Sequence, residues 1–220
     1  MTRCATWPLG EQRAAVRCYT SSGTPIQCCG HGLLCCARHW LSHWQSDGVL
    51  HACDDVVPCT QDGALTWVGL PAVVPTACDT PAWLDRVLDA KTSQQVKDCA
   101  LAGPADGYLV IELAEDTDLA AITPPTADLG KDTRRALIIT CAVSPELARA
   151  GEQIHFRYFA PQYGVSEDAA TGSAMRVLSP YWSRLGTELK ALQCSPTGGV
   201  LYARTDGDHA WVGGQVAPII

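Results

Sequence analysis

The spacing of hydrophobic residues changes once between residues 157 and 182, from that of a strand to that of a helix. Arg157 begins an aromatic, extended stretch that ends in a turn at 161–164. The acidic residues Glu167 and Asp168 follow, and then a run of small residues at 169–174. A helical pattern continues through the apolar residues Met175, Val177, Leu178, Tyr181 and Trp182. This order predicts a strand, a turn and a helix with a carboxylate beside its amino end.

An earlier stretch has the same order of parts. A strand is predicted at 14–20, and a turn with a box of small residues at 21–32 opens a helix over 33–41. That helix is almost wholly apolar, which predicts that it is buried on all sides. Because Arg17 and Arg157 begin similar series, the sequence predicts two similar halves, each with a central helix whose amino end faces a shared cleft.

The other segments read as strands separated by turns, which gives an α+β fold. Short helices are expected at 80–88, where Thr80 caps the first turn, and at 144–146, while no regular element is expected before residue 14. We place a domain boundary near residue 125, giving halves 1–125 and 126–220, and leave open whether the last residues return to the first half. The expected strands cover residues 48–57, 64–70, 107–113, 135–143, 191–195, 199–204 and 209–216.

Composition and charge narrow the classes of function. The chain has 220 residues, of which 47% are hydrophobic and 18% charged, as is typical of a globular protein. Its net charge of −7 argues against a nucleic-acid partner, because phosphates repel a negative surface. No apolar run approaches the roughly 20 residues that a membrane helix needs, and the amino terminus lacks the pattern of a signal peptide. We therefore expect a soluble, cytoplasmic protein without a membrane partner.

Twelve cysteines are unusual for such a protein. An even number is compatible with disulfides, but disulfide frameworks belong mostly to small secreted domains that lack a sufficient core. This chain is long enough to bury a core, so we expect most of its thiols to act as small buried hydrophobic groups. The cysteines meant are Cys4, Cys18, Cys53, Cys59, Cys78, Cys99, Cys141 and Cys194.

The small-residue box of the second half carries a family resemblance. Residues 164–174 read Gly-Val-Ser-Glu-Asp-Ala-Ala-Thr-Gly-Ser-Ala. With the strand before it and the Tyr-Trp helix end after it, this stretch resembles the phenazine-biosynthesis PhzF-like isomerase and epimerase family, except that Ala169 stands where the family usually has proline. The resemblance implies a diaminopimelate-epimerase-like fold of two domains, each a curved, barrel-like mixed sheet around a central helix. It also implies a cofactor-independent proton transfer on a small carboxylated metabolite in the cleft between the domains.

The resemblance further assigns residues to a site. His31 and Asp168 would relay a proton or orient the substrate, while Ser173 and the N–H groups around it would bind a carboxylate. The family's usual general acid and base, a glutamate in a Ser-Glu-Thr motif, falls at about residues 1–3, where no glutamate occurs. The residues that match the family's two boxes are Gly30, His31, Asp168, Thr171, Gly172 and Ser173.

Cys29 offers a second route to catalysis. The string Cys-Gly-His-Gly at 29–32 is similar to a box in the amino-acid racemases and epimerases of the same fold, which use two opposed cysteines, each at a helix amino end that favours the thiolate. The second position falls near Thr171, which is no base at neutral pH, so a symmetric two-thiol racemase is disfavoured. An isomerase that uses Cys29, assisted by His31 or Asp168, remains open.

Each of these residues also has a simpler interpretation. Asp168 is a common type of helix cap, His31 and Ser173 can be ordinary structural residues, and Cys29 can be a packed thiol. At the level of the whole protein, the alternative to an isomerase is a non-catalytic protein that binds a small acid, or a partner subunit. A homodimer is expected if the shortened first half exposes a sheet edge.

One metal site competes with this assignment. Cys35, His39 and His43 share one face of the predicted helix, and these residue types are good zinc ligands. No fourth ligand at a usual spacing is evident, so no metal is expected, and the family resemblance implies that no cofactor is needed.

Overall fold

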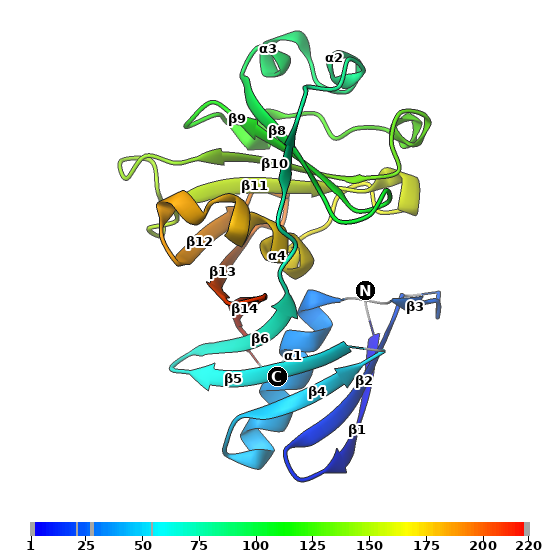
Figure 1. Ribbon diagram of the computed structural model, residues 1–220, viewed down its shortest axis with the longest axis vertical. Helices are drawn as coiled ribbons and strands as arrows, with labels where there is room; N and C mark the ends of the chain where they lie inside the picture. Colours follow the sequence, from blue (N-terminus) through cyan, green and yellow to red (C-terminus); the bar gives the residue numbers. More distant parts are fainter. Residues whose placement is uncertain (1–2, 21, 27–28, 54, 218–220) are drawn as a thin grey trace.

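Two halves, stacked along the long axis of the molecule, share one continuous path of paired strands (Figure 1). The computed structural model describes residues 3–20, 22–26, 29–53 and 55–217. The first half contains β1 (Arg3–Gly10), β2 (Arg13–Tyr19), β3 (Pro25–Ile26), α1 (Gly30–Trp44), β4 (Gly48–Ala52), β5 (Asp55–Asp62) and β6 (Leu65–Pro71). The second half begins with β7 (Thr76–Cys78), α2 (Leu84–Val87), α3 (Ala90–Ser93), β8 (Val96–Ala102), β9 (Tyr108–Leu113), η1 (Leu119–Ala121), η2 (Ala127–Lys131), β10 (Ala136–Ala142) and β11 (Ile154–Phe159). It continues with η3 (Pro161–Tyr163), α4 (Gly172–Tyr181), η4 (Ser183–Leu185), β12 (Glu188–Gln193), β13 (Gly199–Asp206) and β14 (His209–Gln215).

The last strand joins the two halves. The strand order is β1-β2-β4-β5-β6-β14-β13-β12-β11-β10-β9-β8-β7, with β3 paired to β2. Because β14 pairs with β13 on one side and with β6 on the other, the end of the chain returns to the first half. The boundary expected near residue 125 lies between β9 and β10, which pair in parallel within the second half. The chain itself passes between the halves at residues 72–75, after β6.

Both halves repeat one unit, which confirms the expected α+β fold with a central helix in each half. In the first, β1 and β2 pair antiparallel, α1 follows, and β4 lies parallel to β2. In the second, β10 and β11 pair antiparallel, α4 follows, and β12 lies parallel to β11. An antiparallel meander completes each unit, formed by β4-β5-β6 and by β12-β13-β14.

The first central helix buries one face and exposes the other. Leu33, Leu34 and Leu41 of α1 belong to the main core, whereas Cys35 and His39 are exposed. The expectation that this helix is buried on all sides is therefore wrong. The reason is that β4, β5 and β6 pack on α1 as a single curved sheet, which leaves the polar positions of the helix facing solvent.

The second central helix is more completely buried. Met175, Val177 and Leu178 have no exposed surface. Trp182, which follows α4, is 1% exposed and donates from Nε1 to Thr140 Oγ1 at 3.2 Å. None of the helices in the described part of the chain combines the length and the hydropathy that crossing a bilayer requires.

The amino ends of the two central helices touch through glycine backbone. A Cβ atom built on Gly30 would lie 2.7 Å from the Cα of Gly172, and one built on Gly172 would lie 3.0 Å from the Cα of Gly30. Real Cβ atoms essentially never approach backbone as closely as 2.7 Å, so position 30 needs glycine, and the 3.0 Å approach at position 172 is tighter than most real Cβ contacts. This contact brings the ends of α1 and α4 together, as the repeated pattern in the sequence predicts.

Two strand segments differ from the expectation. Residues 48–57 form parts of two antiparallel strands instead of one, because Cys53 adopts a φ of 53° and the chain reverses between β4 and β5. Cys53 is exposed in this turn, so it is not the buried thiol that was expected. Residues 3–10, where no element is expected, form β1 by pairing with β2.

The two short helices also differ. The segment 80–88 contains only the single turn α2, and Thr80 is not its cap. The cap lies further along, where the carboxylate of Asp89 accepts from the N–H groups of Lys91 and Thr92 and opens α3. Residues 144–146 lie in a turn, not in a helix.

The glycine contact predicts that Gly30→Ala destabilises the protein, although alanine usually stabilises a helix. Alanine normally favours a helix over glycine by about 1 kcal/mol. Here the added methyl group meets the backbone of Gly172, so we expect a loss of about 1–3 kcal/mol in the free energy of unfolding. Urea denaturation measures it. Gly214→Ala is the control, because its methyl group would meet only Leu34 at an ordinary 3.5 Å, and equal stability of the two variants would contradict the contact.

Candidate active site

The amino ends of α1 and α4 have the same local geometry. Cys29 precedes α1 with φ −127° and ψ 95°, and Thr171 precedes α4 with φ −103° and ψ 92°. Neither side chain is hydrogen-bonded as a helix cap. The carboxylate of Asp168 accepts from the N–H of Ala169 at 2.9 Å and from Thr171 Oγ1 at 2.8 Å, both ahead of α4. The side chain of Thr171 therefore leaves the first N–H groups of α4 without a cap, an arrangement that suits an anion.

His31 lies between two acidic groups that come from different halves. It belongs to the first turn of α1, and its side chain is exposed. Its hydrogen bond with Cys29 raises the pKa of His31, and the charges of Asp168 and Cys29 raise it further, although partial burial lowers it. These neighbours favour the imidazolium. The structure thus brings Asp168 of the second half close to Cys29 and His31, which are near neighbours in the sequence of the first half.

Cys29 is the negatively charged partner of the His31 imidazolium. The nearby Cys18 thiol lowers the pKa of Cys29, and His31 and the N–H of Gly32 lower it further, against the effect of burial. Hydrogen bonding to Cys29 and burial together raise the pKa of Cys18. Of this coupled pair, Cys29 therefore carries the negative charge and Cys18 keeps its proton.

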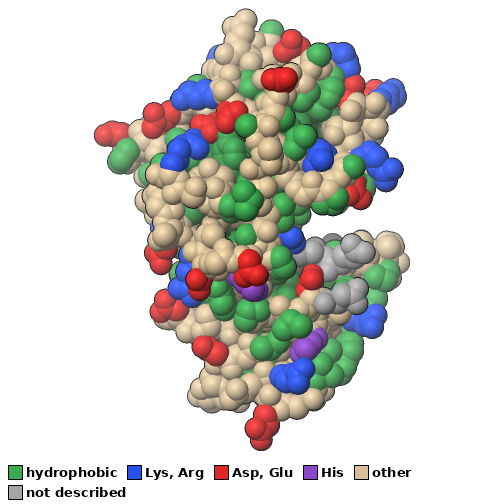
Figure 2. All heavy atoms as spheres, viewed as in Figure 1, with side chains coloured by type: hydrophobic (Ala, Val, Ile, Leu, Met, Phe, Trp, Pro, Cys, Tyr) green, Lys and Arg blue, Asp and Glu red, His purple; other side chains and the backbone are tan. Residues whose placement is uncertain are grey.

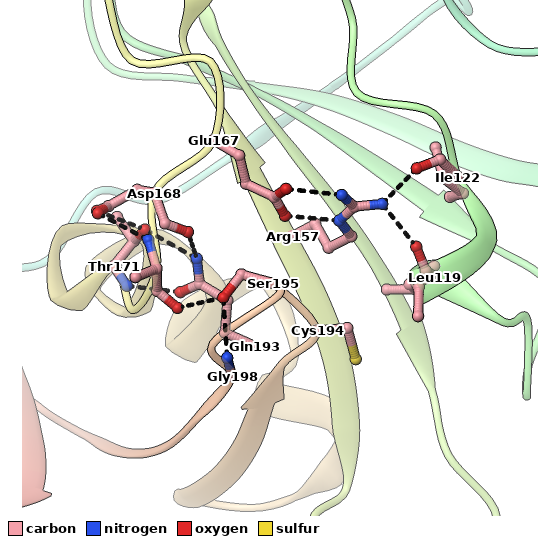
Figure 3. Close-up of polar contacts among 12 residues, drawn as sticks. Leu119, Ile122, Arg157, Glu167, Asp168, Thr171, Gln193, Cys194, Ser195 and Gly198 are labelled. Carbon is pink, nitrogen blue, oxygen red and sulfur yellow. Dashed lines mark hydrogen bonds and ion pairs between the residues drawn. The ribbon is translucent and has the colours of Figure 1, made fainter.

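A buried glutamine holds the loop that carries Asp168 (Figure 3). Gln193, at the end of β12, has no exposed surface. Its Nε2 donates to the carbonyl of Asp168 at 2.5 Å, and its Oε1 accepts from the N–H of Thr171 at 2.5 Å. Asp168 Oδ2 in turn accepts from Thr171 Oγ1 at 2.8 Å. These bonds fix the carboxylate of Asp168 beside the start of α4.

The other acidic residue of the box has a structural role. Glu167 accepts two hydrogen bonds from Arg157, each of 2.7 Å, and Arg157 is only 3% exposed (Figure 3). Arg157 also donates to the carbonyls of Leu119 and Ile122. This buried pair ties the loop after β11 to the sheet. Arg17, which holds the matching place in the first half, is exposed, so the two halves differ here.

The site lies beside open surface. The space-filling view shows the surface indented between the two halves on its right-hand side (Figure 2). A cavity of about 320 Å³ beside α1 is lined by His31, Gly32, Cys35 and Cys4, among others, and Asp168 does not line it. A cavity of about 470 Å³ near Arg86 and Lys131 contains none of the predicted site residues.

The helix face with zinc-ligand residue types is present but holds no metal-binding cluster. His39 and His43 have ring centroids 4.6 Å apart, and His43 Nδ1 lies 3.0 Å from the carbonyl oxygen of His39. Across the described ranges, no group of three or more His, Cys, Asp or Glu side chains has an arrangement that could hold a metal ion. The face formed by Cys35, His39 and His43 is exposed along α1.

The site residues predicted from the sequence lie at the adjoining amino ends of α1 and α4. Cys29, Gly30 and His31 lie at the end of α1, and Thr171, Gly172 and Ser173 at the end of α4, with Asp168 next to them. Their catalytic and binding roles stay predictions. Sequence reasoning missed the roles of Gln193 and Cys18. No local pattern in the sequence indicates that Gln193 binds the Asp168 loop or that Cys18 contacts Cys29.

Comparisons with known proteins agree with this architecture. The model of the PhzC–PhzF family, described as phenazine biosynthesis-like protein, matches residues 8–207. An uncharacterized isomerase from Pseudomonas aeruginosa is 31% identical over 208 residues, which cover 87% of this chain and 71% of that protein. An uncharacterized isomerase from Vibrio cholerae is 32% identical over 194 residues, covering 86% of this chain and 63% of that protein.

A solved structure has the same fold. The crystal structure of a PhzF-family phenazine biosynthesis protein from Enterococcus faecalis matches with a TM-score of 0.80 and 24% identity. The match covers 97% of this chain and 78% of the other. At this identity the likeness concerns the arrangement of the elements and not the chemistry.

The glutamine that holds the Asp168 loop should be costly to replace. Gln193→Leu keeps the approximate size of the side chain but leaves the N–H of Thr171 and the carbonyl of Asp168 without their partner. We expect a loss of about 1–3 kcal/mol in the free energy of unfolding, measured by urea denaturation. Gln94→Leu serves as the control because Gln94 is exposed. A Gln193→Leu protein as stable as this control would contradict the assigned network.

Proposed function

The chain belongs to the PhzC–PhzF family of phenazine biosynthesis-like proteins, and on that basis we propose that it is an isomerase. The proposed reaction is a proton shift within a small carboxylated metabolite, with no metal and no cofactor. The metabolite binds where the amino ends of α1 and α4 meet. The contact of Gly30 with Gly172, which brings His31 next to Asp168, is the observation that carries this proposal.

The substrate carboxylate is held by the helix ends. The N–H groups of Gly30, Gly172 and Ser173 lie in first turns, where the helix itself offers no acceptor. The positive ends of two helix dipoles add to the attraction. Glycine at both ends allows a ligand to approach the backbone closely. Ser173 Oγ adds a hydroxyl donor at the same place.

The proton moves between Cys29 and His31. The Cys29 thiolate removes a proton from the carbon next to the carboxylate, and the negative charge that develops is stabilised by the helix N–H groups. The His31 imidazolium then donates its proton to another carbon of the same molecule. Asp168 stabilises the imidazolium before this step. Transfer of the proton from the Cys29 thiol to neutral His31 restores the starting charges, so no co-reactant is consumed.

Deuterium exchange tests the reaction across a range of candidate substrates. A panel of small α-substituted and unsaturated carboxylic acids is incubated with the protein in D₂O, and deuterium in each acid is followed by NMR. We expect exchange into at least one acid, reduced by about 100-fold or more in His31→Ala and in Asp168→Asn. His43→Ala and Asp128→Asn are matched controls on exposed residues and should exchange at the rate of the unaltered protein.

Two outcomes of this experiment contradict the proposal. Exchange that persists in both site variants would mean that other groups move the proton. Tight binding of an acid by calorimetry, with no exchange into any acid, would instead support the non-catalytic acid-binding protein that is the alternative from the sequence.

The charges of the two groups predict the pH dependence of exchange. The pKa of Cys29 is lowered, so its thiolate is lost only when the pH falls through that low value. The pKa of His31 is raised, so its imidazolium is lost as the pH rises through the raised value. The rate should therefore fall on the acid side as Cys29 gains a proton and on the alkaline side as His31 loses one. A rate that climbs with pH towards about 8.5, the ordinary pKa of a thiol, would contradict the assignment.

Two further expectations from the sequence stay proposals. A homodimer is supported by β1, an edge strand of the described sheet that exposes Trp7 (41%) and Leu9 (51%). The mass of the protein in solution, measured by light scattering, tests this. A cytoplasmic location is proposed from composition alone, and fractionation of the source cells tests it.

A further inference from the structure

Three sulfur atoms meet under the first turn of α1. Cys4 and Cys18 lie directly opposite each other on β1 and β2, with their Sγ atoms 2.7 Å apart. A Cβ atom built on Gly32 would clash with Cys4 Sγ, and would lie 2.8 Å from Cys18 Sγ and 3.2 Å from Cys29 Sγ. All three thiols therefore surround one point, and Gly32 leaves the space that they occupy.

We propose that Cys29, Cys18 and Cys4 form a thiol oxidation site, in which hydrogen peroxide oxidises Cys29 and the oxidation then passes to a disulfide between Cys18 and Cys4. The inference does not rest on the proposed isomerase activity. It needs only the three sulfur atoms and a path for a small oxidant.

The three thiols differ in pKa, and this difference agrees with the proposed order of oxidation. The pKa of Cys29 is lowered by its neighbours, whereas burial raises the pKa of Cys4, and hydrogen bonding to Cys29 together with burial raises that of Cys18. Only a thiolate attacks peroxide readily, so Cys29 reacts first. His31 beside it can supply the proton that the departing oxygen needs.

Small molecules can reach the cluster. The cavity of about 320 Å³ on the exposed side of α1 is lined by Cys4, His31 and Cys35, among others. A second cavity, of about 10 Å³, is lined by Cys18, Cys29 and the neighbouring apolar residues, which is about the space of one water molecule. Hydrogen peroxide is little larger than water, so it is close to the size that this cavity admits.

Each step balances. The Cys29 thiolate attacks one oxygen of hydrogen peroxide, the O–O bond breaks, and the departing hydroxide takes a proton, giving the sulfenic acid Cys–SOH and water. The sulfur of Cys18 then attacks the sulfur of Cys29, an S–S bond forms, the S–O bond breaks, and the proton of Cys18 leaves with the hydroxyl as a second water. Finally Cys4 gives its proton to His31, which replaces the one that His31 supplied, and the sulfur of Cys4 attacks Cys18 and releases Cys29 as a thiolate. Two electrons have passed from two thiols to one peroxide.

Peptide mapping tests the order of steps. The protein, with Cys28→Ser in every sample, is treated with one equivalent of hydrogen peroxide, alkylated and digested with trypsin, and the linked peptides are fragmented in the mass spectrometer. We expect a disulfide from Cys4 in peptide 4–13 to Cys18 in peptide 18–38, with loss of two free thiols, and the fragments distinguish Cys18 from Cys29, Cys35 and Cys36. Cys4→Ser should stop at a disulfide between Cys18 and Cys29, within peptide 18–38. Cys29→Ser should slow the loss of thiols by about tenfold or more, because no thiolate remains in the cluster.

A control and a second readout separate this chemistry from loss of folding. Cys35→Ser changes an exposed thiol on the same helix and should leave the rate and the product unchanged. In Cys18→Ser, the sulfenic acid at Cys29 cannot proceed to that disulfide and should be captured by dimedone. Far-ultraviolet circular dichroism shows whether each variant is folded.

Three results would overturn the proposal. One is an oxidation rate in folded Cys29→Ser equal to that of the unaltered cluster. Another is a first disulfide that involves Cys35 or Cys53 in place of Cys18. The third is the absence of a dimedone adduct on Cys29 in Cys18→Ser.

Discussion

Gly30 and Gly172 press the amino ends of α1 and α4 against each other, backbone to backbone. Two positive helix ends repel, so the arrangement must be held by packing, and the helices do share one core through residues such as Leu33 and Met175. An anion placed between the ends would remove that repulsion. Under the proposed function, the fold would thus prepare a place for negative charge before any ligand arrives, which is the property that electrostatic preorganisation requires.

The charged side chains around this contact depend on its position. His31 is carried by α1 and Asp168 by the loop before α4, so the two meet only because the helix ends meet. Gln193 holds the Asp168 loop from β12, and β12 is the strand that returns after α4. Each half thus positions its part of the site through the same crossover, a strand, a helix and a parallel strand. The thiolate of Cys29 belongs to both the site and the thiol cluster, so oxidation at Cys29 would also remove a charge next to His31.

The sequence predicts much of this architecture because it depends on local periodicity. The two central helices, their small-residue amino ends and the repeated order of parts follow from patterns around Arg17 and Arg157. The split of 48–57 into two strands was not predictable, because Cys53 is not a usual residue for a left-handed turn. The exposed face of α1 was missed because a hydrophobicity pattern counts cysteine as apolar whether or not its side chain is buried. Gln193 and the meeting of Cys4 with Cys18 and Cys29 depend on strand register and on distant contacts, which no local pattern records.

The central claim is that both helix ends serve one anion site. The most direct measurement is an NMR titration of the backbone amides with a small carboxylate such as malonate. The account predicts that the N–H signals of Gly30, His31, Gly172 and Ser173 shift together and fit one dissociation constant, while those at the far end of α1 stay unchanged. Signals that move at only one helix end, or at the two ends with unrelated constants, would contradict it.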